Sequence, residues 1–66
     1  MQVWINGKPG ELTDDARVPD ALALLELPGR GVAVAVDGVV VPRAEWPATA
    51  LADGARIEVL TAVQGG

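Results

Sequence analysis

The sequence contains no cysteine, no histidine and no serine. Without cysteine the chain has no disulfides, no thiol nucleophile and no thiolate ligands for zinc. Without histidine it has no imidazole, the side chain that most often acts as an acid or base near neutral pH. The threonines, Thr13, Thr49 and Thr61, therefore have no imidazole to activate them, so no triad of the serine or threonine type can form. These absences exclude most of the chemistry that small enzymes use.

Positive charge and long apolar runs are also scarce. Five basic residues against nine acidic residues give a net charge of −4 at pH 7, and the isoelectric point is near 4.4. Nucleic-acid binding requires clustered basic side chains, so we expect no nucleic-acid partner. No apolar run approaches the ~20 residues that cross a bilayer, and the first residues lack the cationic stretch and apolar core of a signal peptide. We expect a cytoplasmic protein that has no membrane partner.

The residues that are present indicate one small folded domain. The chain has 66 residues and a mass of 6.8 kDa, which leaves room for a single core. Half of the residues (50%) are hydrophobic and 21% are charged, a composition far from that of disordered chains.

Two dipeptides, Asn6-Gly7 and Asp37-Gly38, are strong signals for tight hairpin turns. The first follows an alternating segment, Gln2 to Asn6, and predicts a short return strand from Lys8 to Leu12. We place this return strand at a sheet edge, because Pro9 has no N–H to donate to a neighbouring strand.

The apolar period changes to that of a helix at Val18. Val18, Ala21, Leu22 and Leu25 form one stripe, and the helix is expected to end near Leu27, before a Pro-Gly break. Three further strands are then predicted, at residues 32–36, 39–41 and 56–63, with a helical turn or loop at residues 42–47. One helix beside four or five strands predicts a two-layer α+β domain.

Few side chains are candidates for chemistry or binding. Adjacent acids at Asp14-Asp15 are interpreted as solvated turn residues, and Gly29-Arg30-Gly31 precedes a strand, whereas a phosphate loop precedes a helix. Trp46 is interpreted as an anchor of the core or its rim, and Arg43 and Arg56 as surface charges. Trp4 is interpreted in the same way as Trp46, and it alternates with Val3 and Ile5, so one sheet face holds the tryptophan and the other the aliphatic side chains. On whichever face lies away from the helix, an exposed apolar patch would mark a partner site.

The last two residues, Gly65-Gly66, offer a different kind of chemistry. Glycine has no Cβ, so it can enter a narrow tunnel in an extended conformation. A terminal carboxylate is ionised at pH 7 and can attack the α-phosphate of ATP on a partner enzyme. The resulting acyl adenylate is open to a sulfur nucleophile, and no side chain of this protein is required.

Two patterns in the C-terminal half are more specific. Val39-Val40-Val41-Pro42-Arg43-Ala44-Glu45-Trp46 contains Pro-Arg-x-x-Trp, and Leu51-Ala52-Asp53-Gly54 places a turn before the last predicted strand. Together with Gly65-Gly66 and the chain length, these segments resemble the ThiS family of thiamine-biosynthesis sulfur carriers over essentially the whole chain.

The resemblance implies an α+β, ubiquitin-like β-grasp fold, with a mixed four- to five-stranded sheet covered on one face by one helix. The first and last strands would lie adjacent and parallel at the centre of the sheet. The β-grasp domain would span residues 1–63, and residues 64–66 would form a flexible C-terminal Gly-Gly tail.

The resemblance also implies a reaction cycle in which the chain is a co-substrate and not an enzyme. An E1-like adenylating enzyme would use ATP and magnesium to adenylate Gly66, and a persulfide sulfur donor would convert it to a thiocarboxylate. The thiocarboxylate would then give its sulfur to thiazole synthase. Gly66 corresponds to the sulfur-bearing glycine of the family and Gly65 to its neighbour in the tail, and no cofactor or metal would be bound by the chain itself.

Three alternatives share features with this interpretation. The small subunit of molybdopterin synthase has the same fold and the same Gly-Gly end. Related carriers supply sulfur for cysteine, siderophore or tRNA thiolation pathways. A ubiquitin-like binding module, in which the tail is inert or forms isopeptide bonds, belongs to another functional class.

Overall fold

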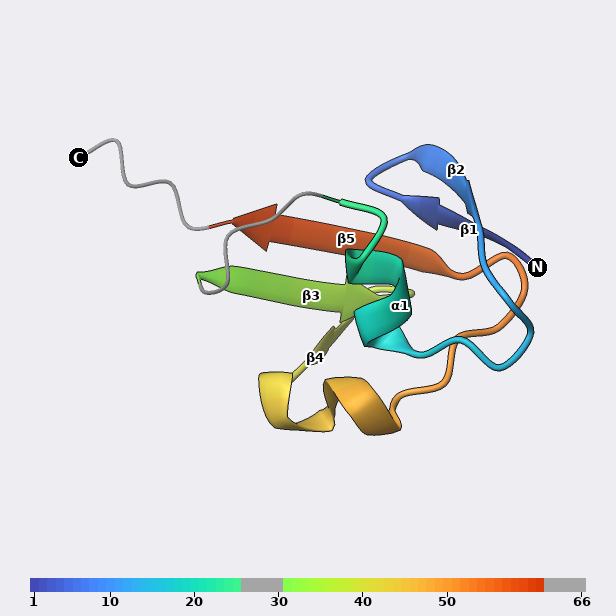
Figure 1. Ribbon diagram of the computed structural model, residues 1–66. Coiled ribbons are helices and arrows are strands. Elements are labelled where there is room, and N and C mark those ends of the chain that lie inside the picture. Colours follow the sequence, from blue (N-terminus) through green and yellow to red (C-terminus); the bar gives the residue numbers. More distant parts are fainter. Residues whose placement is uncertain (26–30, 62–66) are drawn as a thin grey trace.

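The computed structural model describes residues 1–25 and 31–61. Within these ranges the chain forms five strands and two short helices (Figure 1). In chain order they are β1 (Gln2–Ile5), β2 (Lys8–Glu11), α1 (Val18–Leu22), β3 (Val32–Val36), β4 (Val39–Val41), the 3₁₀ helix η1 (Arg43–Ala48) and β5 (Arg56–Thr61).

The strands form one mixed sheet in the order β2-β1-β5-β3-β4. β1 and β5, the first and last strands, are adjacent and parallel, and the other neighbouring pairs are antiparallel. β2 lies at the edge, as predicted from Pro9, whose missing N–H costs nothing on the open side. The α+β fold and the central pairing of β1 with β5 are therefore confirmed.

Both predicted hairpin turns are present and have the same backbone form. Asn6 and Asp37 each have a φ of 51°, and the glycines that follow have φ values of 83° at Gly7 and 85° at Gly38. Positive φ at both central residues is the geometry that joins antiparallel strands through two residues. Asparagine, aspartate and glycine adopt it at the lowest cost, which explains these two dipeptides.

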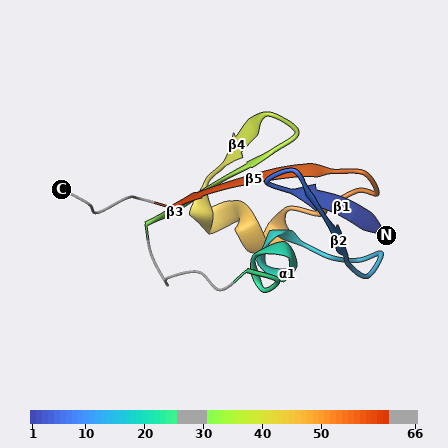
Figure 2. The same ribbon diagram turned by 90° about the horizontal axis from the view of Figure 1, so that it is seen from above.

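The core lies between α1 and one face of the sheet, and Figure 2 shows α1 on a single side. Alternate residues of β1 and β5 point to this side, so Val3 and Ile57 are 0% and 1% exposed. Val18 and Ala21 of α1 cover them. The buried core cluster comprises Val3, Ile5, Val18, Ala21, Val34, Leu51, Ala55, Ile57 and Val59.

The helix is shorter than its apolar stripe predicts. α1 ends at Leu22, and the bonds Leu24 N–H to Ala21 C=O and Leu25 N–H to Leu22 C=O, at 3.1 and 3.0 Å, span three residues each. The chain thus tightens into turns of the 3₁₀ type after Leu22, and Leu25 remains partly buried without an α-helical turn. The predicted end near Leu27 is wrong for residues 23–25, and Leu27 itself lies outside the described residues.

The remaining elements agree with the sequence interpretation up to the limits of the described chain. The segment predicted as a helical turn or loop is η1, and β5 is described as far as Thr61. The predicted boundary between a domain at 1–63 and a tail at 64–66 lies outside the described residues. None of the described helices has the length and apolar character to cross a membrane.

Candidate functional site

The sheet face opposite α1 carries a set of outward-pointing side chains, which we call the outer face. The strand register defines it. Trp4 of β1 is paired with Arg56 of β5, and Ala33 of β3 is paired with Leu60. The outer face includes Trp4, Ala33, Ala35, Val40, Arg56, Glu58 and Leu60.

Large apolar side chains on the outer face remain open to solvent. Trp4 is 40% exposed, Leu60 69% and Val40 71%. Ala33 and Ala35 of β3 add small side chains to the same face. The prediction that Trp4 and the aliphatic pair Val3 and Ile5 lie on different faces is confirmed, and the structure shows that the tryptophan face is the one away from α1. This face has the apolar character of a protein-binding surface.

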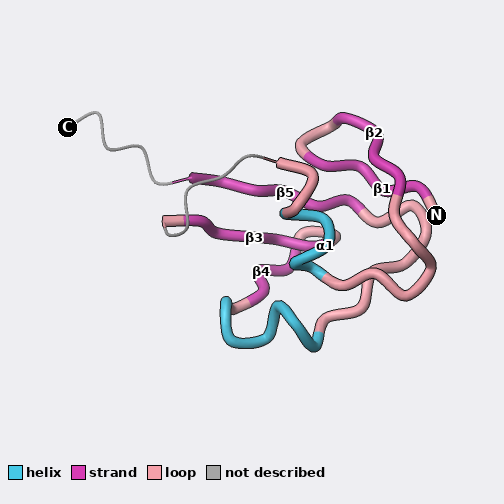
Figure 3. The backbone as a smooth tube through the Cα atoms, viewed as in Figure 1, coloured by secondary structure: helices cyan, strands magenta, loops and turns pink. Residues whose placement is uncertain are grey.

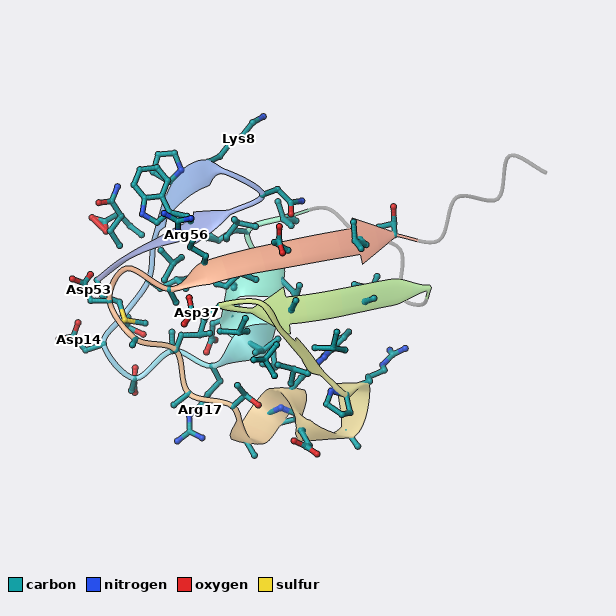
Figure 4. All side chains as sticks on the ribbon, turned by 180° about the vertical axis from the view of Figure 1, so that it is seen from behind. Lys8, Asp14, Arg17, Asp37, Asp53 and Arg56 are labelled. Carbon is teal, nitrogen blue, oxygen red and sulfur yellow. The ribbon has the colours of Figure 1, made fainter. Side chains whose placement is uncertain are left out.

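Charge on the outer face is concentrated at the beginning of β5. Figure 4 views the sheet from this side, with α1 behind it, and Arg56 lies at the start of β5 near the turn that holds Asp37. Glu58 follows on the same face of the strand. In the described part of the chain, the only ion pair joins the N-terminal amino group and Asp14, so neither Arg56 nor Glu58 is in a salt bridge there. Arg56 is a surface charge, as predicted, and it is available to a partner.

The apolar end of the outer face lies towards the tail. Leu60 is the last outward-pointing residue of β5 in the described chain, and five residues follow Thr61 in the sequence. At ~3.3–3.6 Å per extended residue, five residues span at most about 18 Å. The predicted site residues, Gly65 and Gly66, lie outside the described residues, and their role stays a prediction.

The Pro-Arg-x-x-Trp segment forms η1 and attaches it to β4. The Trp46 indole donates its Nε1 hydrogen to the Val41 carbonyl at 2.9 Å, and its ring is partly buried against the core. The Arg43 guanidinium lies over the same ring, 5.5 Å from the centroid. Residues three apart are aligned in a 3₁₀ helix, which explains the spacing. Trp46 is confirmed as an anchor, whereas the interpretation of Arg43 as no more than a surface charge is wrong.

The other candidate positions have structural roles. Asp14 lies 3.5 Å from the N-terminal nitrogen, and Asp15 accepts a hydrogen bond from the Thr13 hydroxyl at 2.8 Å. Asp53 accepts the Gln2 N–H at 2.8 Å and so joins the turn before β5 to the start of β1. Among residues 1–25 and 31–61, no three acidic side chains come together as metal ligands.

Sequence reasoning treated Asn6 as a turn residue and missed its second role. Its side-chain Oδ1 accepts the Val59 N–H at 2.8 Å, and its Nδ2 donates to the Val59 carbonyl at 3.1 Å. The two residues are 53 positions apart, so no local pattern could reveal the contact. The signal in the sequence was the choice of asparagine at a turn that glycine or aspartate also suits.

Comparison with known proteins agrees with this geometry. The model of the ThiS family matches residues 3–66. A crystal structure of the thiamine biosynthesis protein ThiS from Geobacter metallireducens is similar, with a TM-score of 0.80 and 30% identity, over 100% of both chains. A solution structure of a thiamine biosynthesis protein from the same organism gives 0.78 and 30%, over 100% of this chain and 88% of that one. A comparison with curated proteins gave no match. Fold, length and family match lead to one conclusion: the chain belongs to the ThiS family.

Proposed function

We propose that this protein is a sulfur carrier for thiazole formation in thiamine biosynthesis, with the sulfur held on Gly66 as a thiocarboxylate. The observation that carries the proposal is the family match, which extends to residue 66 and so includes Gly65 and Gly66. A relative of full matching length, at 30% identity, is a thiamine biosynthesis protein.

The proposed chemistry needs only the C-terminal carboxylate of this chain. On an E1-like adenylating enzyme, a Gly66 carboxylate oxygen attacks the α-phosphorus of ATP, and pyrophosphate leaves with its magnesium. The terminal sulfur of a donor persulfide then attacks the acyl carbon, and AMP leaves. A second thiol reduces the resulting acyl disulfide, which releases the thiocarboxylate and leaves a disulfide on the donor side. The absence of cysteine, histidine and serine from the chain is compatible with every step.

The outer face provides the surface by which partners would hold the carrier during these steps. Trp4 and Leu60 offer exposed apolar area, and Arg56 adds a charge that a partner carboxylate can pair with. Leu60 lies directly before the tail, so a partner docked there is within reach of the C-terminus. Thiazole synthase would use the same face after the adenylating enzyme has left.

Intact-mass measurement tests the proposal. The protein is incubated with the adenylating enzyme of its host, ATP, magnesium and a persulfide donor, beside a variant that lacks Gly65 and Gly66. We expect the full chain alone to gain the mass difference between sulfur and oxygen. The variant Asp14→Ala, which removes an exposed ion pair with the N-terminal amino group, serves as the positive control and should gain the same mass.

Two results would overturn the proposal. One is the absence of any sulfur gain by the folded full chain when the adenylating enzyme is active on another substrate protein. The other is an equal gain in the shortened chain, because the sulfur would then be attached elsewhere. Transfer of the sulfur to thiazole synthase, and not to a molybdopterin precursor, distinguishes this pathway from that of the molybdopterin synthase small subunit.

A further inference from the structure

The strand that leads to the tail has neighbours of unequal length. β3 pairs with β5 from Ile57 to Thr61, whereas β1 pairs with it only at Arg56 and Ile57. Figure 3 shows that β5 continues well beyond the turn between β1 and β2. The second half of β5, from Glu58 to Thr61, therefore has a neighbouring strand on one side only.

On the side of β5 where β1 has ended, the Asn6 side chain binds the first backbone groups that have no strand partner. The last backbone bond between the two strands joins the Asn6 N–H to the Ile57 carbonyl, at 2.9 Å. Beyond it the chain turns away, and the next rung is made by the side-chain amide of Asn6, which binds both the N–H and the C=O of Val59. The amide thus replaces a peptide group of β1 and holds β5 two residues before the described strand ends.

The two hairpin turns explain why this residue is asparagine. At Asp37, the backbone N–H already binds the Arg56 carbonyl at 2.7 Å, so the side chain needs only an acceptor for the Arg56 N–H. An aspartate carboxylate is such an acceptor. At Val59 both an N–H and a C=O face the side chain, and an amide offers an acceptor and a donor on separate atoms, whereas an aspartate carboxylate offers acceptors alone. Since both turns have the same φ of 51°, turn geometry alone does not select asparagine.

We propose that Asn6 is a positioning residue for the reaction at the C-terminus, and this inference rests on the proposed carrier function. The outer face fixes the carrier on its partner, while the amide of Asn6 fixes the direction in which β5 delivers the tail. Attack on the α-phosphorus of ATP requires the carboxylate within ~3–3.5 Å at the correct angle, so a loosened strand end lowers the rate of the step. Trp4 lies in β1, and Leu60 keeps its pairing with Ala33 of β3, so we expect docking through these two side chains to survive the loss of the Asn6 amide.

The test is the kinetics of carrier-dependent ATP–pyrophosphate exchange by the host's adenylating enzyme. Asn6→Gly removes the amide and keeps a residue that adopts positive φ freely, and Asn6→Asp keeps only the acceptor. Asn6→Gly removes two hydrogen bonds to Val59, each of modest net strength, and we expect it to lower kcat about tenfold with an unchanged KM for the carrier. Asn6→Asp should give an intermediate kcat.

Asp53→Ala is the matched control, since Asp53 also joins β1 to the C-terminal segment but does so at the end of β1 remote from the tail. It should lower thermal stability and leave both kcat and KM unchanged. Amide hydrogen exchange provides a second readout that does not depend on the enzyme. The backbone N–H of Val59 should exchange faster in Asn6→Gly, because it loses its acceptor. The backbone N–H of Glu58, a residue paired with Ala35 of β3, should exchange at the wild-type rate.

The outcomes separate the two proposals. If the wild-type chain supports no exchange with an active enzyme, the carrier function fails and the positioning role fails with it. If the wild-type chain is active and folded Asn6→Gly retains its kcat, the inference about Asn6 alone is wrong. A rise in KM at unchanged kcat would also contradict it, because the Asn6 amide would then contribute to docking. Should Asn6→Gly fail to fold, Asn6→Asp carries the decision: a kcat below that of wild type at an unchanged KM supports the inference, and a wild-type kcat contradicts it.

Discussion

Replacing Trp46 by phenylalanine removes one hydrogen bond and keeps an aromatic ring in the same place. The Val41 carbonyl then loses its 2.9 Å bond from the indole Nε1 at a partly buried position. A lost bond of this type lowers the free energy of unfolding by about 1 kcal/mol, because water reaches the vacated acceptor incompletely. In the wild type the Arg43 guanidinium lies 5.5 Å from the centroid of the Trp46 ring. A phenyl ring attracts the cation less strongly than an indole does, which adds a few tenths of a kcal/mol to the loss of stability.

Thermal and urea unfolding followed by circular dichroism measure this loss. For a domain of this size, about 1 kcal/mol lowers Tm by about 4–8 °C. The same loss lowers the urea midpoint by about 1 M at an m value near 1 kcal/mol/M. Trp4→Phe is the matched control, since the Trp4 side chain is 40% exposed and has no hydrogen bond among those of the described chain. It should change Tm by less than about 3 °C.

The reasoning is refuted if the two tryptophan variants lose equal stability. In that case the indole N–H of Trp46 contributes nothing beyond ring area. A double-mutant cycle with Arg43→Ala separates the contribution of the cation. We expect a coupling energy of about 0.5 kcal/mol between Arg43 and Trp46, and a value of zero would mean that their contact is without energetic consequence.

Three further predictions address the core, a turn and the outer face. Ile57→Ala, at a side chain that is 1% exposed, should lower the free energy of unfolding by about 2–5 kcal/mol and leave much of the protein unfolded at 37 °C, as checked by circular dichroism. Gly38→Ala should cost about 1 kcal/mol through its φ of 85° alone, because nothing lies within 4 Å of the added Cβ; an unchanged urea midpoint would contradict this. Leu60→Glu should keep Tm within about 3 °C and raise the carrier's KM for the adenylating enzyme about tenfold, and an unchanged KM would exclude Leu60 from the docking surface.

The sequence predicted those parts of the fold that depend on local rules. Alternation predicted that Val3 and Ile5 share one face of β1 and Trp4 the other, and the dipeptides Asn6-Gly7 and Asp37-Gly38 predicted both hairpins. The position of β2 at an edge followed from Pro9, because a residue without an N–H is tolerated there.

The features that the sequence did not predict depend on contacts between distant segments or on a change of helical geometry. The apolar stripe from Val18 to Leu25 is compatible with α-helical and 3₁₀ turns alike, so it could not locate the end of α1 at Leu22. The stacking of Arg43 on Trp46 required η1 to be a 3₁₀ helix. The bond from Asn6 to Val59 required the parallel pairing of β1 with β5, which only the complete sheet provides.

The alternation of β5 separates stability from partner binding within one strand. Ile57 and Val59 point into the core, while Glu58 and Leu60 point outwards to solvent. Substitutions at the inward positions should therefore reduce the folded population without a direct effect on partners, and substitutions at the outward positions should do the reverse. The Val59 backbone is the exception, because its hydrogen bonds to Asn6 lie in the plane of the sheet. They belong neither to the inward-pointing nor to the outward-pointing side chains. Among substitutions that affect β5, a loss of rate without loss of docking is consequently expected where that in-plane contact is removed.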